Sequence, residues 1–154
     1  MLIFYKKECD QMAQVEFEYR VADPNLGPGT PIPLTVGTPY LVASLKGGAG
    51  LTIQASTYNV WLTGIFGILQ TSPSTSITVE ITRSIGAGAE SLIYSQDIDY
   101  APNETDDNHV VSVNHVDVPG AVGSVRYFLY VTVEDGSASL TLPVTFTGQQ
   151  NTPG

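Results

Sequence analysis

Hydrophobic and polar residues alternate with a period of two along most of the chain, and no long helical pattern interrupts them. Successive side chains of a strand point to opposite faces, so this alternation predicts strands with one buried face. At residues 77–82, for example, Ile77, Val79 and Ile81 form an apolar side between polar neighbours, and residues 139–147 repeat the pattern.

Runs of this kind, separated by glycine- and proline-rich breakers, predict the strands that follow the N-terminal segment. They cover residues 32–36, 40–45, 51–55, 58–70, 77–82, 92–97, 110–117, 125–134 and 139–147. Asp135-Gly136 predicts a hairpin between the last two, because both residues tolerate the positive φ of a type I′ turn. Pro143 predicts an edge or a bulge, because proline lacks the N–H. Short one-sided strands at this spacing predict an all-β, antiparallel two-sheet sandwich, jelly-roll-like ahead of immunoglobulin-like.

The N-terminal segment predicts one further strand at about residues 14–22, with Val15, Phe17, Tyr19 and Val21 on one face. Residues 23–31 then contain three prolines and two glycines, which forbid a helix or a continuous ladder. We therefore divide the chain into three parts. They are an N-terminal extension (1–31), a sandwich domain (32–148) and a C-terminal tail (149–154).

A strand on such a linker has two structural options, and the residues leave both open. It can fold back as an edge strand of its own sheet. It can instead pair with a neighbouring molecule, where backbone hydrogen bonds give affinity and alternate side chains fill a groove. Head-to-tail use of the strand would produce an open filament. In that case Val15, Phe17, Tyr19 and Val21 form the contact between subunits.

The charge of the chain excludes some partners. Charged residues make up 14% of it, against about 25% in an average protein, and the formal net charge is −9. We expect neither a nucleic-acid nor a membrane partner, because both surfaces are anionic and the sequence offers no basic stripe. No apolar run approaches the roughly 18 residues of a membrane span, and the apolar start is too short for a signal peptide.

Catalytic signals are weak in this sequence. Its two histidines, His109 and His115, would lie on one face of a strand roughly 20 Å apart, too far to share a metal. No nucleophile elbow, zinc-binding helix or phosphate-binding glycine loop occurs. We therefore expect the protein not to be an enzyme.

An acidic stretch is the best candidate for a metal site, and no other cofactor is expected. It contains Asp97, Asp99, Glu104, Asp106 and Asp107. Calcium takes six to eight oxygen ligands, which loops between strands can supply. The stretch does not follow the EF-hand spacing, and the alternative is a solvated loop tip.

Two single residues complete the candidates. Cys9 is the only cysteine, so any disulfide it forms joins two molecules; the alternative is a free thiol. Trp61 could stack on a sugar, but it falls within a run that is apolar on both faces. That context favours a buried or interface position for Trp61.

Six segments, taken in order, carry a family resemblance. They are VWLTG (60–64), ITVEITR (77–83), SLIYS (91–95), VDVPG (116–120), YFLYVTV (127–133) and LPVTFTG (142–148). The series resembles small spore-surface proteins of spore-forming bacilli, including exosporium components and subunits of endospore appendage fibres. The resemblance implies a jelly-roll-like subunit on the spore surface or in an extracellular appendage, without a classical signal peptide and linked through its N-terminal extension. The chain departs from the disulfide-linked appendage type, in which several cysteines are expected.

We therefore expect a structural subunit that self-assembles into a fibre or surface layer by donating its N-terminal strand to a neighbouring subunit. Its partners would be copies of itself and an anchoring or tip protein. The alternatives are a trimeric jelly-roll ligand-binding head, of the tumour-necrosis-factor or complement kind, and a carbohydrate-binding module.

Overall fold

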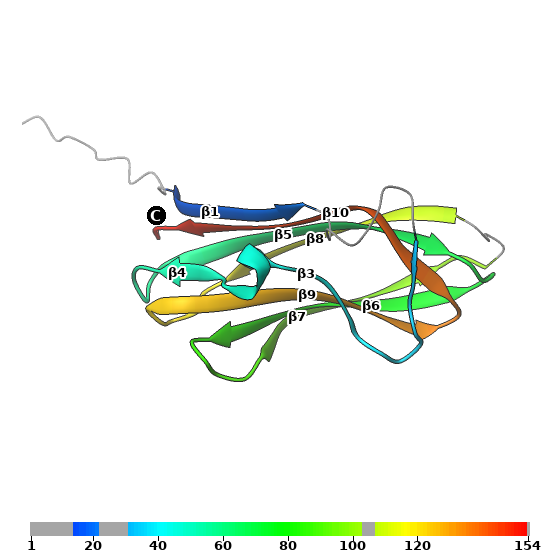
Figure 1. Ribbon diagram of the computed structural model, residues 1–154, viewed down its shortest axis with the longest axis horizontal. Helices are drawn as coiled ribbons and strands as arrows, with labels where there is room; N and C mark the ends of the chain where they lie inside the picture. The colour runs from blue at the N-terminus through cyan, green and yellow to red at the C-terminus, as the bar shows by residue number, and fades with distance from the viewer. Residues whose placement is uncertain (1–13, 22–30, 103–106, 154) are drawn as a thin grey trace, which may run out of the picture.

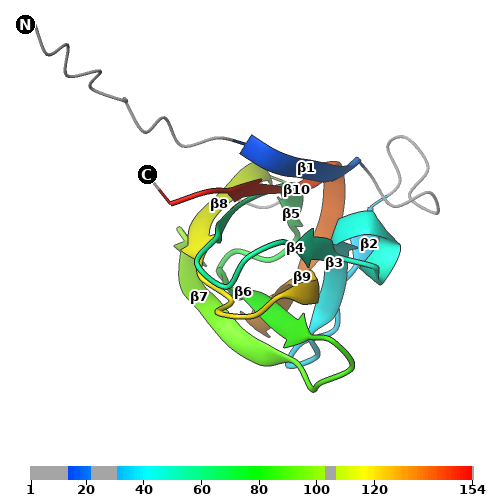
Figure 2. The same cartoon turned by 90° about the vertical axis from the view of Figure 1, so that its left-hand side faces the viewer.

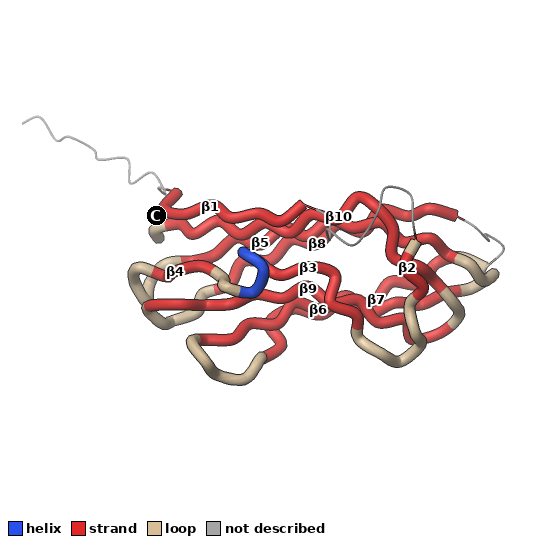
Figure 3. Tube along the Cα trace, viewed as in Figure 1, coloured by secondary structure: helices blue, strands red, loops and turns tan. Residues whose placement is uncertain are grey.

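A computed structural model describes residues 14–21, 31–102 and 107–153, the first of these segments as backbone. Two antiparallel sheets are stacked face to face (Figures 1 and 2). This architecture confirms the predicted all-β, two-sheet sandwich of jelly-roll type. Strands form nearly all of the regular structure, and the one helix among the described residues is the short 3₁₀ turn η1 (Leu45–Gly48) (Figure 3). No helix in this part of the chain is long and apolar enough to cross a membrane.

One sheet has the strand order β1-β10-β5-β8, and β2 also pairs with β10. Its members are β1 (Gln14–Val21), β2 (Ile32–Pro33), β5 (Asn59–Gln70), β8 (Asp107–Asp117) and β10 (Ala138–Asn151). The other sheet has the order β3-β9-β6-β7, and β4 also pairs with β9. Its members are β3 (Tyr40–Ser44), β4 (Leu51–Ile53), β6 (Thr75–Ile85), β7 (Ser91–Tyr100) and β9 (Gly123–Asp135).

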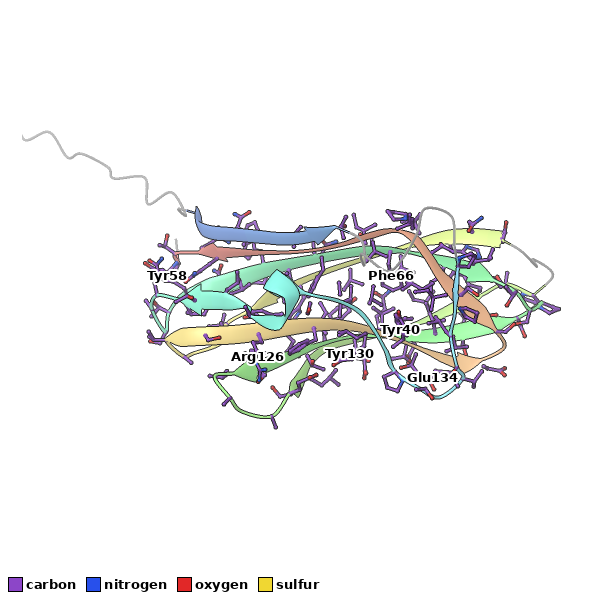
Figure 4. All side chains as sticks on the ribbon, in the orientation of Figure 1. Tyr40, Tyr58, Phe66, Arg126, Tyr130 and Glu134 are labelled. Atoms are coloured by element: carbon purple, nitrogen blue, oxygen red, sulfur yellow. The ribbon has the colours of Figure 1, made fainter. Side chains whose placement is uncertain are left out.

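The core lies between the two sheets and follows the period-two pattern of the sequence. Its largest fully buried side chains include Phe66 and Phe146 from one sheet and Tyr127 from the other. Phe66 is labelled in Figure 4. The sheets approach closely at Gly64, where a Cβ atom would lie 2.8 Å from Leu129 Cδ2. A side chain at that position would therefore displace the end of the Leu129 side chain.

The predicted hairpin at Asp135-Gly136 is wrong. Gly136 has the positive φ of a tight turn, 79°, but the turn leads from β9 in one sheet to β10 in the other. A Cβ atom at Gly136 would collide with the carbonyl oxygen of Ser74, so this turn packs closely against the connection between β5 and β6. Alternation identifies a strand's buried face but not its neighbour, and the only consecutive strands that pair among the described ones are β6 and β7.

The last strand is longer than predicted and contains the predicted bulge. Its register with β5 shifts between Thr141 and Val144, on either side of Pro143. It then continues to Asn151, so residues 149–151 belong to the sheet and not to a tail. Gln150 explains the extension, because this fully buried side chain accepts from Gln54 N at 2.9 Å and donates to the Thr52 carbonyl at 3.0 Å. A polar residue thus joins the sheets where the apolar alternation has ended.

The first predicted strand of the sandwich is shorter than expected. Of residues 32–36, only Ile32 and Pro33 form β2, and Val36 makes an isolated parallel bridge to Val133. This segment therefore runs across from β10 of one sheet toward β9 of the other.

Candidate assembly surfaces

The backbone of β1 forms the outer edge of its sheet, antiparallel to β10. The register runs from Gln14 opposite Asn151 to Val21 opposite Thr145. Because β5 covers the other side of β10, β1 and β2 lie one after the other along the same edge. In a single chain the N-terminal strand thus has the position of a folded-back edge strand.

The connection between β1 and β2 is longer than its span requires. Val21 is opposite Thr145 and Ile32 is opposite Leu140, so the two ends are separated by five positions of β10. Five strand residues cover about 17 Å, whereas the eleven residue steps from 21 to 32 can reach about 36 Å. The chain length therefore permits β1 to pair at a β10 edge other than its own.

The backbone register assigns the apolar positions of β1 to a particular face of the sheet. Phe17, Tyr19 and Val21 are opposite Gln149, Thr147 and Thr145. Those three positions of β10 alternate with the buried Phe146 and Gln150 and lie on the outer face. Directly opposed residues share a face. Three of the four predicted apolar positions of β1 are therefore in register with outward positions of β10 in this pairing.

The outer face of this sheet carries no ionisable residue on β5, β8 or β10 along its central length; we call it the neutral face. Its positions are Trp61, Thr63, Ile65, Gly67 and Leu69 of β5, Asn108, Val110, Ser112, Asn114 and Val116 of β8, and Thr141, Thr145, Thr147 and Gln149 of β10. Several apolar side chains on it meet solvent. Trp61 is 44% exposed, its cross-strand partner Val116 is 53% exposed, and Val110 is 67% exposed.

The exposure of Trp61 decides between the two positions predicted for it. The ring is not buried, because Trp61 alternates with the buried Val60 and Leu62 and so points outward from a central strand. It borders an open depression of about 290 Å³ whose lining also includes Asn114, Val116 and the edge-strand residue His115. An aromatic ring at such a place suits contact with a partner molecule.

The opposite outer face, on β6, β7 and β9, is acidic. On β6, Glu80 lies between the buried Val79 and Ile81 and so points outward. On β7, Asp97 and Asp99 flank Ile98, which is opposite the buried Ile77, so both aspartates also point outward. Asp97 accepts a 2.8 Å hydrogen bond from Thr78 Oγ1, and Tyr130 donates to Glu90 at 3.1 Å. Burial, together with this bond to Glu90, raises the pKa of Tyr130. The two faces of the sandwich therefore differ sharply in charge.

The predicted calcium ligands are only partly placed. Asp97 and Asp99 are on β7, Asp107 begins β8 in the other sheet, and Glu104 and Asp106 lie outside the described residues. Among the described residues, no three acidic, histidine or cysteine side chains come together as a metal-binding group. The calcium site stays a prediction. Cys9 also lies outside the described residues.

The two histidines of β8 pack against tyrosines of β7, which is an edge strand of the other sheet on the same side of the sandwich (Figure 2). The His109 ring stacks on Tyr100 with centroids 4.0 Å apart, and its Nε2 is 3.2 Å from Gln70 Oε1. The His115 ring is 5.6 Å from that of Tyr94. Burial raises the pKa of the Tyr100 phenol. These contacts give both histidines a packing role that joins the sheets along one side.

Comparison with known proteins gives a likeness at the level of fold. No protein-family model matches the sequence, and no curated protein sequence matches it. Among solved structures, the chain is similar to Eiger TNF from S. frugiperda, with 13% identity and a TM-score of 0.54 over 89% of this chain and 92% of that one. A structure of infectious bursal disease virus, Gx strain, is similar over 88% of this chain but only 32% of its own, with 10% identity and a TM-score of 0.49. The first likeness shows a shared jelly-roll fold.

Proposed function

We propose that this chain is a structural subunit that assembles with copies of itself into a fibre or surface layer. In this proposal β1 of one subunit pairs with the β10 edge of the next. The observation that carries it is the position of β1, on an open sheet edge and at the end of a connection about twice as long as its span requires. Exchange of such an edge strand between identical molecules preserves every backbone bond while joining the molecules.

The part of the fold that would receive the strand has a described core of its own. The buried apolar residues, among the side chains that the structure describes, run from Val42 to Phe146 and come from β3 to β10. Without a strand beside it, β10 would leave backbone N–H and C=O groups unpaired along residues 145–151. An uncovered edge of this kind is a template for another chain. A donated strand from a neighbour would satisfy it.

The location that we propose rests on the resemblance of residues 60–148 to spore-surface proteins. We extend the proposal to an appendage or outer layer of a bacterial spore, with an anchoring or tip protein as a further partner. The proposal includes no catalytic role, and it treats both histidines as packing residues.

Engineered cysteines can distinguish donation from folding back. Tyr19 and Thr147 are directly opposite across the β1–β10 pair, and opposed Cα atoms of antiparallel strands lie close enough for a disulfide. Two proteins, each with Cys9→Ser, are denatured, mixed and refolded together. One carries Tyr19→Cys and the other carries Thr147→Cys. Donation predicts covalent dimers of the two proteins after mild oxidation.

Two controls make the result decisive. Tyr19→Cys mixed with Ser95→Cys, which is exposed on β7 of the other sheet, reports random collision and should yield few dimers. The double variant Tyr19→Cys with Thr147→Cys in one chain reports folding back. If that chain forms only an internal disulfide, and the mixture forms no dimers above the Ser95→Cys level, strand donation is wrong.

A further inference from the structure

We infer that the neutral face is a second contact between copies of this chain, formed by packing that face of one subunit against the same face of another. The contact uses the face of the sheet, whereas strand donation uses the edge of β10. With strand donation, the face contact lets an assembly grow in a second direction. Alone, it gives a closed pair of subunits. The occupant is a second copy, for three physical reasons.

The first reason is charge. The chain has a formal net charge of −9, yet the outward positions of β5, β8 and β10 that form the neutral face contain no ionisable residue. Like charges within a Debye length of about 10 Å repel, so two copies meeting at their acidic faces would repel. The neutral face is the surface on which identical acidic molecules can approach. A basic partner would instead be drawn to the opposite sheet, which carries Glu80, Asp97 and Asp99.

The second reason is the low cost of removing water from this face. Several of its polar side chains already bond one another or the backbone: Thr63 donates to Asn114 Oδ1 at 3.0 Å, and Thr147 donates to the Thr63 carbonyl at 3.3 Å. Polar groups paired in this way lose little when water is displaced. The exposed apolar surface of Trp61, Val110 and Val116 gains from the same displacement.

The third reason is size and shape. Three adjacent strands of about a dozen residues make a patch on the order of 600 Å² in projection, and side-chain relief enlarges its accessible area. A specific interface buries roughly 800 Å² on each partner. Two such faces can stack at the roughly 10 Å spacing of packed sheets. When both partners use the same patch, that patch must be complementary to itself. A patch without charged residues brings no like charges together.

The test uses charge at Val116, which is exposed and opposite Trp61. In the full-length chain, Val116→Lys and Val116→Asp each place like charges across the contact. Sedimentation velocity over a range of concentrations should show at least a tenfold weaker self-association for either variant alone. Leu92→Lys is the matched control, because Leu92 is 56% exposed on β7 of the other sheet, and it should leave association unchanged.

Mixing the variants separates a lost contact from a damaged fold. Equal amounts of Val116→Lys and Val116→Asp should associate at least tenfold more tightly than either alone, because opposite charges then face each other. Association that is insensitive to both variants, or absent from the unmodified chain, would overturn the inference. So would glycan binding by a monomer that is lost in Trp61→Ala, since the ring would then serve a sugar.

The two tests distinguish failure of one contact from failure of the other. If charge at Val116 controls association but the Tyr19–Thr147 dimers do not form, the neutral face is a contact and strand donation is wrong. If the dimers form equally in Val116→Lys and association is unchanged, donation holds and the neutral face is not an interface.

Discussion

Tyr127 donates a 2.8 Å hydrogen bond to Asp117 in the interior, and this bond joins β9 of one sheet to β8 of the other. Arg83 of β6 donates to the second carboxylate oxygen of Asp117 at 2.7 Å. Asp117 is 6% exposed and Tyr127 is fully buried. A buried carboxylate costs stability unless it is paired and hydrogen-bonded, and both donors meet that need here, so this network stabilises one end of the sandwich.

Tyr127→Phe removes one of the two donors without a change of shape. We expect the free energy of unfolding at pH 7 to fall by about 1–3 kcal/mol, because a buried acceptor loses a partner. Chemical denaturation monitored by fluorescence measures this difference. An unchanged midpoint would show that the bond contributes nothing.

The same substitution should change the response to alkali. Burial, and then the charge of Asp117, raises the pKa of Tyr127 far above its usual value of 10. Below pH 10 both the folded and unfolded states keep the proton. Above pH 10 the unfolded state loses it and the folded state does not, so stability falls by about 1.4 kcal/mol per pH unit for this group. Tyr127→Phe should remove that part of the slope between pH 10 and 11.

Asp117→Asn tests the ion pair from the other side. Arg83 would then be left partly buried without a counter-charge, and breaking a buried pair costs about 3–5 kcal/mol. We expect the lower end of that range, because Arg83 retains some exposure, 20% of its side chain. Asp99→Asn is the matched control, since Asp99 is exposed on β7, and it should change stability by less than about 0.5 kcal/mol.

Alternation along the sequence predicted the strands well because it follows directly from burial on one face. It could not predict which strands become neighbours. Asp135-Gly136 has the chemistry of a hairpin turn, yet β9 and β10 separate into different sheets. The predicted end of the last strand was also too early. The strand continues to Asn151, and its buried residue there is Gln150, whose amide makes hydrogen bonds and breaks the apolar alternation.

The neutral face was missed for a related reason. Absence of charge at alternate positions of residues 61–69, 108–116 and 141–149 is visible in the sequence. It becomes one surface only when β8, β5 and β10 are known to be adjacent. The run around Trp61 is apolar on both faces of the strand, so the sequence could not show whether the ring points into the core or toward solvent. Its exposure shows that it points toward solvent.

Gln150→Ala tests the polar link between β10 and the β4 region. The substitution removes the acceptor of Gln54 N and the donor to the Thr52 carbonyl, so two backbone groups each lose one hydrogen bond. We expect a loss of about 1–3 kcal/mol in the free energy of unfolding. Gln149→Ala is the control on the adjacent outward position, and it should cost less than about 1 kcal/mol. Equal losses would show that the strand end, and not the amide, matters.

Deletion of residues 1–22 tests whether β1 joins subunits. The core of the described chain comes from β3 to β10, so we expect the truncated protein to keep its far-ultraviolet circular dichroism and a cooperative unfolding transition. Ordered assembly should be lost, because residues 145–151 of β10 no longer receive a strand. The concentration needed for fibres in electron micrographs should rise at least tenfold. Deletion of residues 1–13 is the matched control, since it removes Cys9 but leaves β1 whole, and it should preserve fibres. Undiminished fibres from the longer deletion would exclude strand donation, and loss in both would transfer the role to Cys9 and its neighbours.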